Sequence, residues 1–374
     1  DEAACATREA AWLRTLCADV SAVDPADYGK LDGLIASPPC TAFSMAGDGE
    51  GRKAIDVYLE AIRRWSAHGE SPDYAQLDEA CGDPSAHLVL EPLRWAIATD
   101  PEWVALEQVP TVLPVWEAIG AALSVRGYYV WTGLLSAEQF GVPQTRARAF
   151  LLARKHAHGT FDPPAPTHQR YVAPRVKEKQ EETLFEAPEP ERIVLPEDEG
   201  LLPWVSMAEA LGWGMTARPS VTVPATSGEG GPRALDGGSG ARETVQDAIA
   251  HGEWANAPEG HPSHIHFRAT NDRPNVATRP ADAPAPTLAF GHNPPRWLTG
   301  KSGMQCDARI APAGHHDTHM EGSVRVTVAE AAVLQSFPAD YPFQGTRTKQ
   351  FQAVGNAVPP LLAWAVLKAV VPGV

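Results

Sequence analysis

The chain has 374 residues and a formal net charge of −15, and its five cysteines form neither CxxC pairs nor an even disulfide framework. The length predicts a main domain and a substantial second one, and the cysteine usage favours a reduced, cytoplasmic protein over a secreted one. No signal peptide is visible, and no apolar run approaches the roughly 18 residues of a membrane span. The negative charge excludes a surface coated with cations, although it is compatible with a local basic cleft.

Apolar patterning in the first 155 residues predicts strands that alternate with helices. Helical periodicity indicates helices over 1–13, 54–68, 85–99 and 111–126, the first of them without an N-cap of its own. Strands are expected over 16–20, 31–36, 101–109, 128–135 and 148–154. This alternation is typical of an α/β fold with a doubly wound, mostly parallel sheet.

The segment 31–47 is the most informative stretch of the chain. Its apolar run, 31–36, predicts a short buried strand that ends at Ser37, Pro38 and Pro39, because proline cannot donate to a sheet. Cys40 follows directly, at the kind of strand end where α/β sheets place ligands and chemistry. A buried, inert thiol is the alternative interpretation. Residues 41–53 are rich in glycine and polar residues and predict a mobile loop.

The composition changes after residue 155. The acidic run 178–199 is interpreted as a solvated excursion, and 200–320 as a loop-rich, irregular domain. Within 200–320, the segment 267–301 contains more basic than acidic residues. This excess fits either a nucleic-acid-facing surface or solvated loop charge. The residues concerned are Arg268, Arg273, Arg279, Arg296 and Lys301, with Phe267 and Trp297 among them. Histidines at 261, 264, 266, 315, 316 and 319 lack a matched ligand set, so we expect no metal.

Regular structure is expected again over 324–337 and 361–371. Thr327, with Glu330 three residues later, predicts a capping box at a helix start. The apolar helix 361–371 is expected to pack on the sheet. Packing does not explain Asn356 before that helix, and an N-terminal cap is one interpretation of it.

Five short blocks carry a family resemblance. They are Ser-Pro-Pro-Cys at 37–40, Glu-Gln-Val at 107–109, Gln-Thr-Arg-Ala-Arg at 144–148, the segment 325–337, and Gly-Asn-Ala-Val at 355–358. Because these five blocks follow one another in this order, the chain resembles the DNA cytosine-5 methyltransferases of bacterial and phage type. The resemblance implies the S-adenosylmethionine-dependent methyltransferase fold, with a catalytic and cofactor domain at 1–155. It also implies an inserted target-recognition region at 156–323. The C-terminal segment 324–374 would then re-enter the catalytic domain and complete it.

The resemblance implies a covalent mechanism. Cys40 would add to C6 of a flipped-out cytosine, and Glu107, kept partly protonated by burial, would contact N3 and the 4-amino group. Arg146 and Arg148, on one side of a regular strand, would brace the base, its sugar-phosphate and Glu107. Alone, the carboxylate and the arginines could equally be solvated surface charge. Substrate contacts are implied for Pro38 and Gln144.

The implied methyl donor is S-adenosylmethionine. Asp19 would bind its adenine amino group, although a simple turn carboxylate is the alternative for this residue. The full set of implied cofactor residues is Asp19, Val20, Pro39, Leu88, Asn356 and Val358. Double-stranded DNA is the implied partner, and a cognate restriction endonuclease would act without physical contact. We expect a monomer that does not bind a membrane.

Two departures from the family pattern affect these expectations. The middle block normally reads Glu-Asn-Val, so Gln108 puts the local backbone in doubt more than the chemistry. The family's first block, an apolar strand and a glycine-rich loop, has no counterpart, which suggests an N-terminally truncated record of a longer protein. The missing block leaves a catalytically inactive DNA-binding remnant as an alternative to an active DNA enzyme. A tRNA cytosine-5 methyltransferase, which shares the catalytic blocks, is the other alternative, and the long insert argues against it.

Overall fold

The computed structural model describes residues 1–39, 55–172, 193–212, 265–268, 278–281, 283–287, 296–299 and 323–374. Cys40, the loop expected over 41–53 and most of 200–320 lie outside these ranges, as do residues 178–192 of the acidic run. The chain divides into two compact units. Unit 1 contains residues 1–15, 137–146 and 167–360, and unit 2 contains 16–136, 147–166 and 361–374. The functional division expected at residues 155 and 323 stays a prediction.

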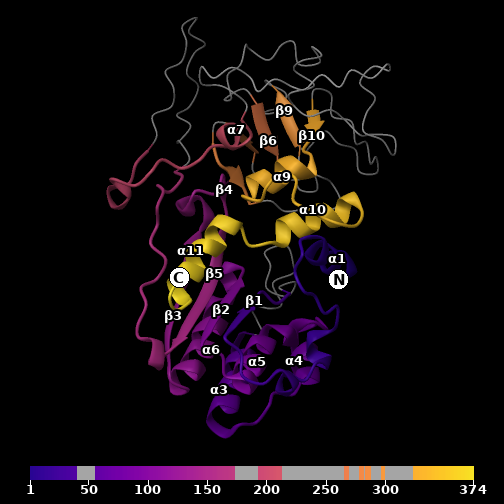
Figure 1. Ribbon diagram of the computed structural model, residues 1–374, viewed down its shortest axis with the longest axis vertical. Coiled ribbons are helices and arrows are strands. Elements are labelled where there is room, and N and C mark those ends of the chain that lie inside the picture. Colours follow the sequence, from indigo (N-terminus) through magenta and orange to yellow (C-terminus); the bar gives the residue numbers. More distant parts are fainter. Residues whose placement is uncertain are drawn as a thin grey trace, which may run out of the picture. The chain divides into compact units, whose positions relative to one another are not determined.

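Unit 2 is built on a four-stranded sheet with the order β1-β2-β5-β3. Its strands are β1 (Gly33–Ala36), β2 (Trp103–Gln108), β3 (Tyr128–Ser136) and β5 (Ala147–Lys155). β1 pairs parallel with β2, and β5 lies antiparallel between β2 and β3, so three strands share one direction (Figure 1). The predicted α/β fold and four of the five predicted strands are confirmed.

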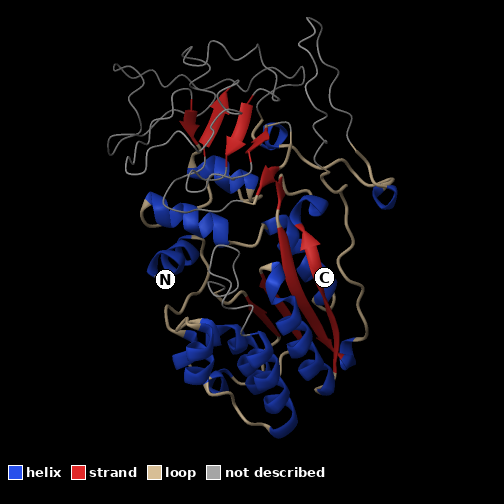
Figure 2. Cartoon of the chain, turned by 180° about the vertical axis from the view of Figure 1, so that it is seen from behind, coloured by secondary structure: helices blue, strands red, loops and turns tan. Residues whose placement is uncertain are grey.

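Both faces of this sheet are covered. In β5, Ala149, Leu151 and Ala153 join the core that α6 (Leu113–Val125) also forms, and the intervening Phe150 and Leu152 are buried as well. Because successive strand residues point to opposite faces, this unbroken burial requires a layer on each side. The Arg154 guanidinium also donates to the carbonyl of Val370, 2.8 Å away, in α11 (Pro360–Val370). Figure 2 gives the reverse view of these strands and helices.

The predicted helices of the first 155 residues are present, with corrections at their ends. α1 (Glu2–Ala10) does have an N-cap, since the Asp1 carboxylate accepts from the amides of Ala3 and Ala4. The predicted helix 85–99 is a 3-10 segment (Ala86–Leu90) followed by α5 (Glu91–Thr99), because Pro92 suits the first turn of a helix and not its interior. α3 (Ile55–His68) and α6 match the prediction, whereas α4 (Tyr74–Cys81) and α10 (Arg347–Asn356) were not predicted.

The strand predicted over 16–20 is wrong. Residues Val20–Ala22 form a 3-10 turn instead, with Asp19 as its N-cap. The Asp19 carboxylate accepts from both the amide and the hydroxyl of Ser21. Such local side-chain bonds offer the backbone an alternative to a sheet ladder, which explains why the apolar run 16–20 does not become a strand. Within the described residues, further 3-10 segments are Pro25–Tyr28, Pro110–Val112, Ala137–Phe140, His156–His158 and Pro196–Asp198.

Unit 1 contains a second sheet where an irregular domain was expected. Its strands β10 (Ser323–Arg325), β9 (Arg296–Thr299), β6 (Ile265–Arg268) and β7 (Thr278–Pro280) pair antiparallel in that order. β4 (Gln144–Thr145) pairs with β8 (Ala285–Pro286). Trp297 is fully buried in the core of this unit, together with residues of α7 (Met207–Ala210) and α9 (Val328–Leu334), so it does not belong to an exposed surface. The predicted capping box of Thr327 and Glu330 is confirmed at the start of α9.

One stretch of the described chain is long and apolar enough for a membrane span by length and composition, contrary to expectation. It covers Arg347–Val370, with a mean hydropathy of 1.4. The stretch consists of two helices, α10 and α11, which end and begin on either side of Ala357–Pro359. Each buries one side within the protein, through Phe351 and Val354 in α10 and Leu362, Val366 and Val370 in α11. Of the most apolar window in this stretch, 28% is buried inside the protein, so the finding rests on length and composition alone.

Candidate functional site

The turn that precedes Cys40 is tied to the neighbouring strand. The side-chain amide of Gln108, at the end of β2, donates to the carbonyl of Pro38 at 2.5 Å. The carbonyl oxygen of the same side chain accepts from the amide of Val109 at 2.6 Å. Gln108 is only 5% exposed, so both bonds are shielded from water. Cys40 itself lies outside the described residues.

Glu107 is the residue next to this tie, and it is held by a cation. Its side chain is 10% exposed, and Arg148 Nε in β5 lies 3.1 Å from Oε1 of the carboxylate. The two strands are direct neighbours in the sheet. The carboxylate that the sequence places in a buried site therefore also contacts a guanidinium. Arg148 and Glu107 thus form an ion pair, and the role of Arg148 toward a bound base stays a prediction.

Arg146 and Gln144 lie on the other side of a unit boundary. Arg146 falls between β4 and β5 and is 2% exposed, so the regular strand that would align it with Arg148 is absent. Gln144 is fully buried, and its amide donates to the Leu334 carbonyl and to Gln335. The Gln335 amide in turn donates to the Ala357 carbonyl at 2.7 Å. Gln144 thus anchors β4 to the end of α9, and its contact with substrate stays a prediction.

A pocket of about 370 Å³ opens beside β1 in unit 2. It is lined by the end of β1, the Ser37–Pro39 turn, Val20, Leu88 and the first residues of α5, namely Glu91, Pro92 and Trp95. Its size falls within the range of small-molecule sites, and its walls are mostly apolar. Three residues that the sequence assigned to the cofactor, Val20, Pro39 and Leu88, therefore line one pocket.

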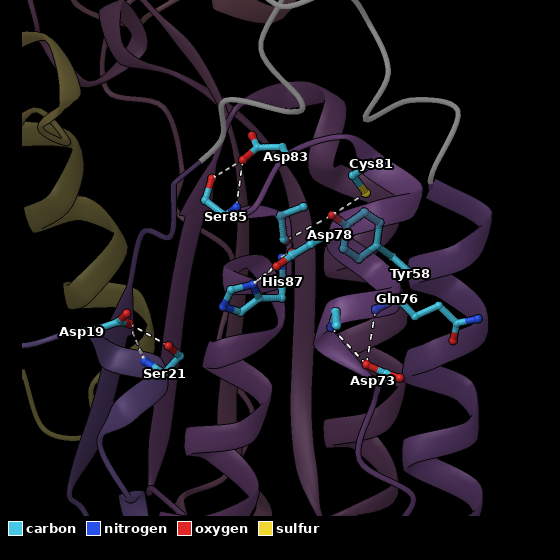
Figure 3. Close-up of polar contacts among 12 residues, drawn as sticks. Asp19, Ser21, Tyr58, Asp73, Gln76, Asp78, Cys81, Asp83, Ser85 and His87 are labelled. Carbon is cyan, nitrogen blue, oxygen red and sulfur yellow. Dashed lines mark hydrogen bonds and ion pairs between the residues drawn. The ribbon is translucent and has the colours of Figure 1, made fainter.

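Asp19 adjoins this pocket through Val20. Both bonds from Ser21 go to Oδ1, and they hold the pKa of the Asp19 carboxyl below its ordinary value, with a smaller contribution from the charge of His87. Within the described part of the chain, Oδ2 accepts no further hydrogen bond. Figure 3 shows Asp19 and Ser21 beside His87, whose ring nitrogen Nδ1 lies 2.8 Å from Asp78. An ionised carboxylate with one oxygen left over can accept from a ligand donor.

The remaining cofactor residues, Asn356 and Val358, belong to unit 1. Asn356 is the last residue of α10 and is exposed, so its interpretation as an N-terminal cap of the final helix is wrong. That helix begins at Pro360, which needs no capped amide. The contact of Asn356 and Val358 with a cofactor stays a prediction.

Comparison with known proteins decides the family. A family model described as C-5 cytosine-specific DNA methylase matches residues 1–200 and 267–371. The chain belongs to this family. It is 25% identical to Type II methyltransferase M1.HphI of Haemophilus parahaemolyticus, over 92% of this chain and 69% of that protein. It is 24% identical to Type II methyltransferase M.DdeI of Desulfomicrobium norvegicum, over 94% of this chain and 76% of that protein. DNA (cytosine-5)-methyltransferase 3 of Arabidopsis thaliana is 25% identical over 90% of this chain and 23% of that protein.

Membership of the DNA methylase family confirms the predicted resemblance and gives the chain its enzyme class, cytosine-5 methylation of DNA. It also makes the departure at residue 108 interpretable. Gln108 forms two bonds that fix the end of β2 and the turn at Pro38, so the local backbone does have a side chain that holds it.

Sequence reasoning missed two polar groups that the methylase fold brings to the pocket. Glu91 lines it and is 3% exposed, and Arg94 contacts both Glu91 and the turn after Asp19. The only sequence signal was the spacing of three residues between the two charges on a predicted helix. Among the described residues, no group of three or more His, Cys, Asp or Glu could hold a metal ion. Most of the histidines considered above, His261, His264, His315, His316 and His319, lie outside those residues.

Proposed function

We propose that this chain methylates cytosine at C5 within duplex DNA, with Cys40 as the nucleophile, Glu107 at N3 and S-adenosylmethionine as the methyl donor. The observation that carries the proposal is the bond from Gln108 to Pro38. It ties the turn that leads into Cys40 to the end of the strand that carries Glu107. Thiol and carboxyl group would thus come from the ends of two paired strands, β1 and β2.

The chemistry requires both groups. Cytosine C5 is too weakly nucleophilic to take a methyl group unaided. Addition of the Cys40 thiolate to C6 forms an S–C6 bond, and a proton delivered to N3 by Glu107 makes C5 enamine-like. When bound, the cofactor supplies an electrophilic methyl group for C5. Transfer of the C5 proton to water then expels the Cys40 thiolate and breaks the S–C6 bond. Return of the N3 proton to Glu107 restores the neutral aromatic ring and the starting acid.

Arg148 would keep Glu107 directed at the base through their ion pair, and Arg146 would contact the base and its sugar-phosphate. Because the target lies inside a duplex, it must leave the stack to reach these groups. The segment 156–323 would choose the target sequence, with Gln144 and Pro38 contacting the substrate.

The residues of the pocket in unit 2 fit S-adenosylmethionine. Its apolar walls, formed by Val20, Leu88 and Pro92, suit a flat adenine ring. The unused oxygen of Asp19 suits the adenine amino group as a donor. Pro39 would complete this wall, and the family resemblance implies cofactor contacts for Asn356 and Val358 as well.

A substitution at Glu107 tests this function. In Glu107→Gln we expect the rate of methyl transfer to duplex DNA to fall by roughly 10²- to 10⁴-fold, because the amide cannot deliver a proton to N3. DNA affinity should remain close to that of the unsubstituted chain. Glu117→Gln, an exposed position in α6, is the matched control and should retain full activity. An unchanged rate in Glu107→Gln would show that Glu107 does not act at the base.

A further inference from the structure

The segment that carries Asp19 and Val20 has little regular structure of its own. It consists of two short 3-10 turns, Val20–Ala22 and Pro25–Tyr28, and Val20 is 40% exposed. Local bonds such as those between Asp19 and Ser21 shape the turn, but they do not fix its position against the rest of the fold. A contact from another element must do so if Val20 is to form a wall of the pocket.

Arg94 of α5 provides that contact. Its Nη2 donates to the carbonyl of Val20 at 2.8 Å and to that of Val23 at 3.0 Å. These are the first residue of the turn and the residue that ends it. One guanidinium nitrogen thus holds both ends of the turn whose N-cap is Asp19. The side chain is 21% exposed, so the bonds are partly shielded from solvent.

The Glu91 carboxylate orients the same guanidinium by contacting its Nε and Nη2 atoms. Arg94 Nε lies 3.0 Å and 2.9 Å from the two carboxylate oxygens of Glu91, and Nη2 lies 2.6 Å from one of them. The Glu91 side chain is 4% exposed, so its charge requires a partner. Because Glu91 also lines the pocket, the pair connects the wall made by α5 to the wall made by the turn.

We propose that Arg94 is a positioning residue of the cofactor pocket, which fixes Asp19 and Val20 at the distance from α5 that the bound adenosine group requires. This inference rests on the proposed use of the pocket for S-adenosylmethionine. Arginine is needed because its planar fork can bond the carboxylate and the carbonyls together. Lysine would keep the charge beside Glu91 but would lack this fixed geometry.

The test is direct binding of S-adenosylmethionine, and of S-adenosylhomocysteine, to the full chain by calorimetry. We expect Arg94→Lys to raise both dissociation constants by about tenfold or more, which corresponds to about 1.4 kcal/mol per factor of ten. Arg63→Lys is the matched control, because Arg63 forms the same i,i+3 pair with Glu60 on the exposed side of α3. It should bind both ligands as the unsubstituted chain does.

A double-mutant cycle separates positioning from a general loss of stability. If Arg94 acts through the turn, Arg94→Lys should weaken binding much less in an Asp19→Asn background than in the unsubstituted chain. Melting temperatures recorded without ligand identify any variant that fails to fold. Unchanged binding in Arg94→Lys, or effects that simply multiply in the double variant, would overturn the role of Arg94. Failure of the unsubstituted chain to bind either ligand would overturn the proposed cofactor site and, with it, this inference.

Discussion

At the scale of single residues, Gln108 shows how a departure from the family pattern is accommodated. The side chain spans two partners, the carbonyl of Pro38 and the amide of Val109, and it is nearly inaccessible to solvent. A buried amide that loses its partners leaves polar backbone groups unsatisfied, which is costly. The identity of residue 108 therefore matters for the geometry of the strand ends although it takes no part in the chemistry.

Replacement of Gln108 should therefore slow methyl transfer without abolishing cofactor binding. In Gln108→Leu, loss of the bond to Pro38 should lower kcat by roughly 5- to 150-fold, the equivalent of about 1 to 3 kcal/mol for a buried unsatisfied group. Steady-state kinetics on duplex DNA measure this. Gln76→Leu, at an exposed position of α4, is the control. If Gln108→Leu and the unsubstituted chain have equal kcat values, the bond from Gln108 to Pro38 does not position the strand ends for methyl transfer.

At the scale of elements, the sequence predicted those segments whose periodicity is strong. β2, β3, β5, α3 and α6 appear within a few residues of their predicted bounds, because each buries a regular apolar pattern. The errors have local causes. Asp19 turns an apolar run into a 3-10 segment, and Pro92 divides a predicted helix. The polar helix α10 was missed because its apolar face consists of only a few residues, including Phe351 and Val354.

The turn after the 3-10 segment Ala137–Phe140 depends on a glycine. Gly141 has a φ of +82°, and a Cβ there would lie 2.8 Å from a ring carbon of His168. Gly141→Ala should therefore lower stability by more than the roughly 1 to 2 kcal/mol of a left-handed alanine, since His168 must also move. Gly127→Ala is the control, with a φ of +86° and no atom within 4 Å of the added Cβ.

Thermal unfolding measures both glycine variants. We expect a clearly larger loss of Tm for Gly141→Ala than for Gly127→Ala. Equal losses would show that the ring of His168 does not confine this turn, which leads through Val142 to Gln144.

At the scale of the whole molecule, the sheet of unit 1 places arginines in register. Arg268 of β6 stands opposite Arg296 of β9, and Arg296 stands opposite Arg325 of β10. Like charges directly opposite one another disfavour pairing, unless an anion lies against them. The backbone register thus brings three arginine positions together in a row on neighbouring strands. Contact of Arg268 and Arg296 with nucleic acid stays a prediction, which we extend to Arg325.

Neutralising this row should weaken DNA binding in a salt-dependent way. In a variant with Arg268→Gln, Arg296→Gln and Arg325→Gln, the slope of log K against log salt should fall by roughly 2 to 3, or about 0.9 for each lost phosphate contact. Fluorescence anisotropy at several salt concentrations measures the slope. A variant with Arg63→Gln and Arg64→Gln, both exposed on α3, is the control. An unchanged slope would mean that the row does not face the phosphates.

The sequence predicted the candidate site in part. Local sequence patterns indicate which residues are present, but not the long-range contacts that hold them. Short sequence blocks predict the residues that the proposed chemistry requires, and three of the predicted cofactor residues do line one pocket. The contacts that hold those residues, from Arg94 to the turn and from Gln108 to Pro38, join positions 70 or more residues apart. No local periodicity encodes such contacts, so only the structure reveals them.

The central claim is that Cys40 attacks C6 of a cytosine in DNA. The most direct measurement is incubation of the chain with S-adenosylmethionine and duplex DNA that contains 5-fluorocytosine, followed by denaturing electrophoresis. Fluorine at C5 cannot leave as a proton does, so the S–C6 bond should persist as a denaturant-stable adduct. We predict this adduct for the unsubstituted chain and for Cys17→Ser, an exposed control cysteine, and none for Cys40→Ser. An adduct in Cys40→Ser, or tight DNA binding without any adduct, would contradict the account.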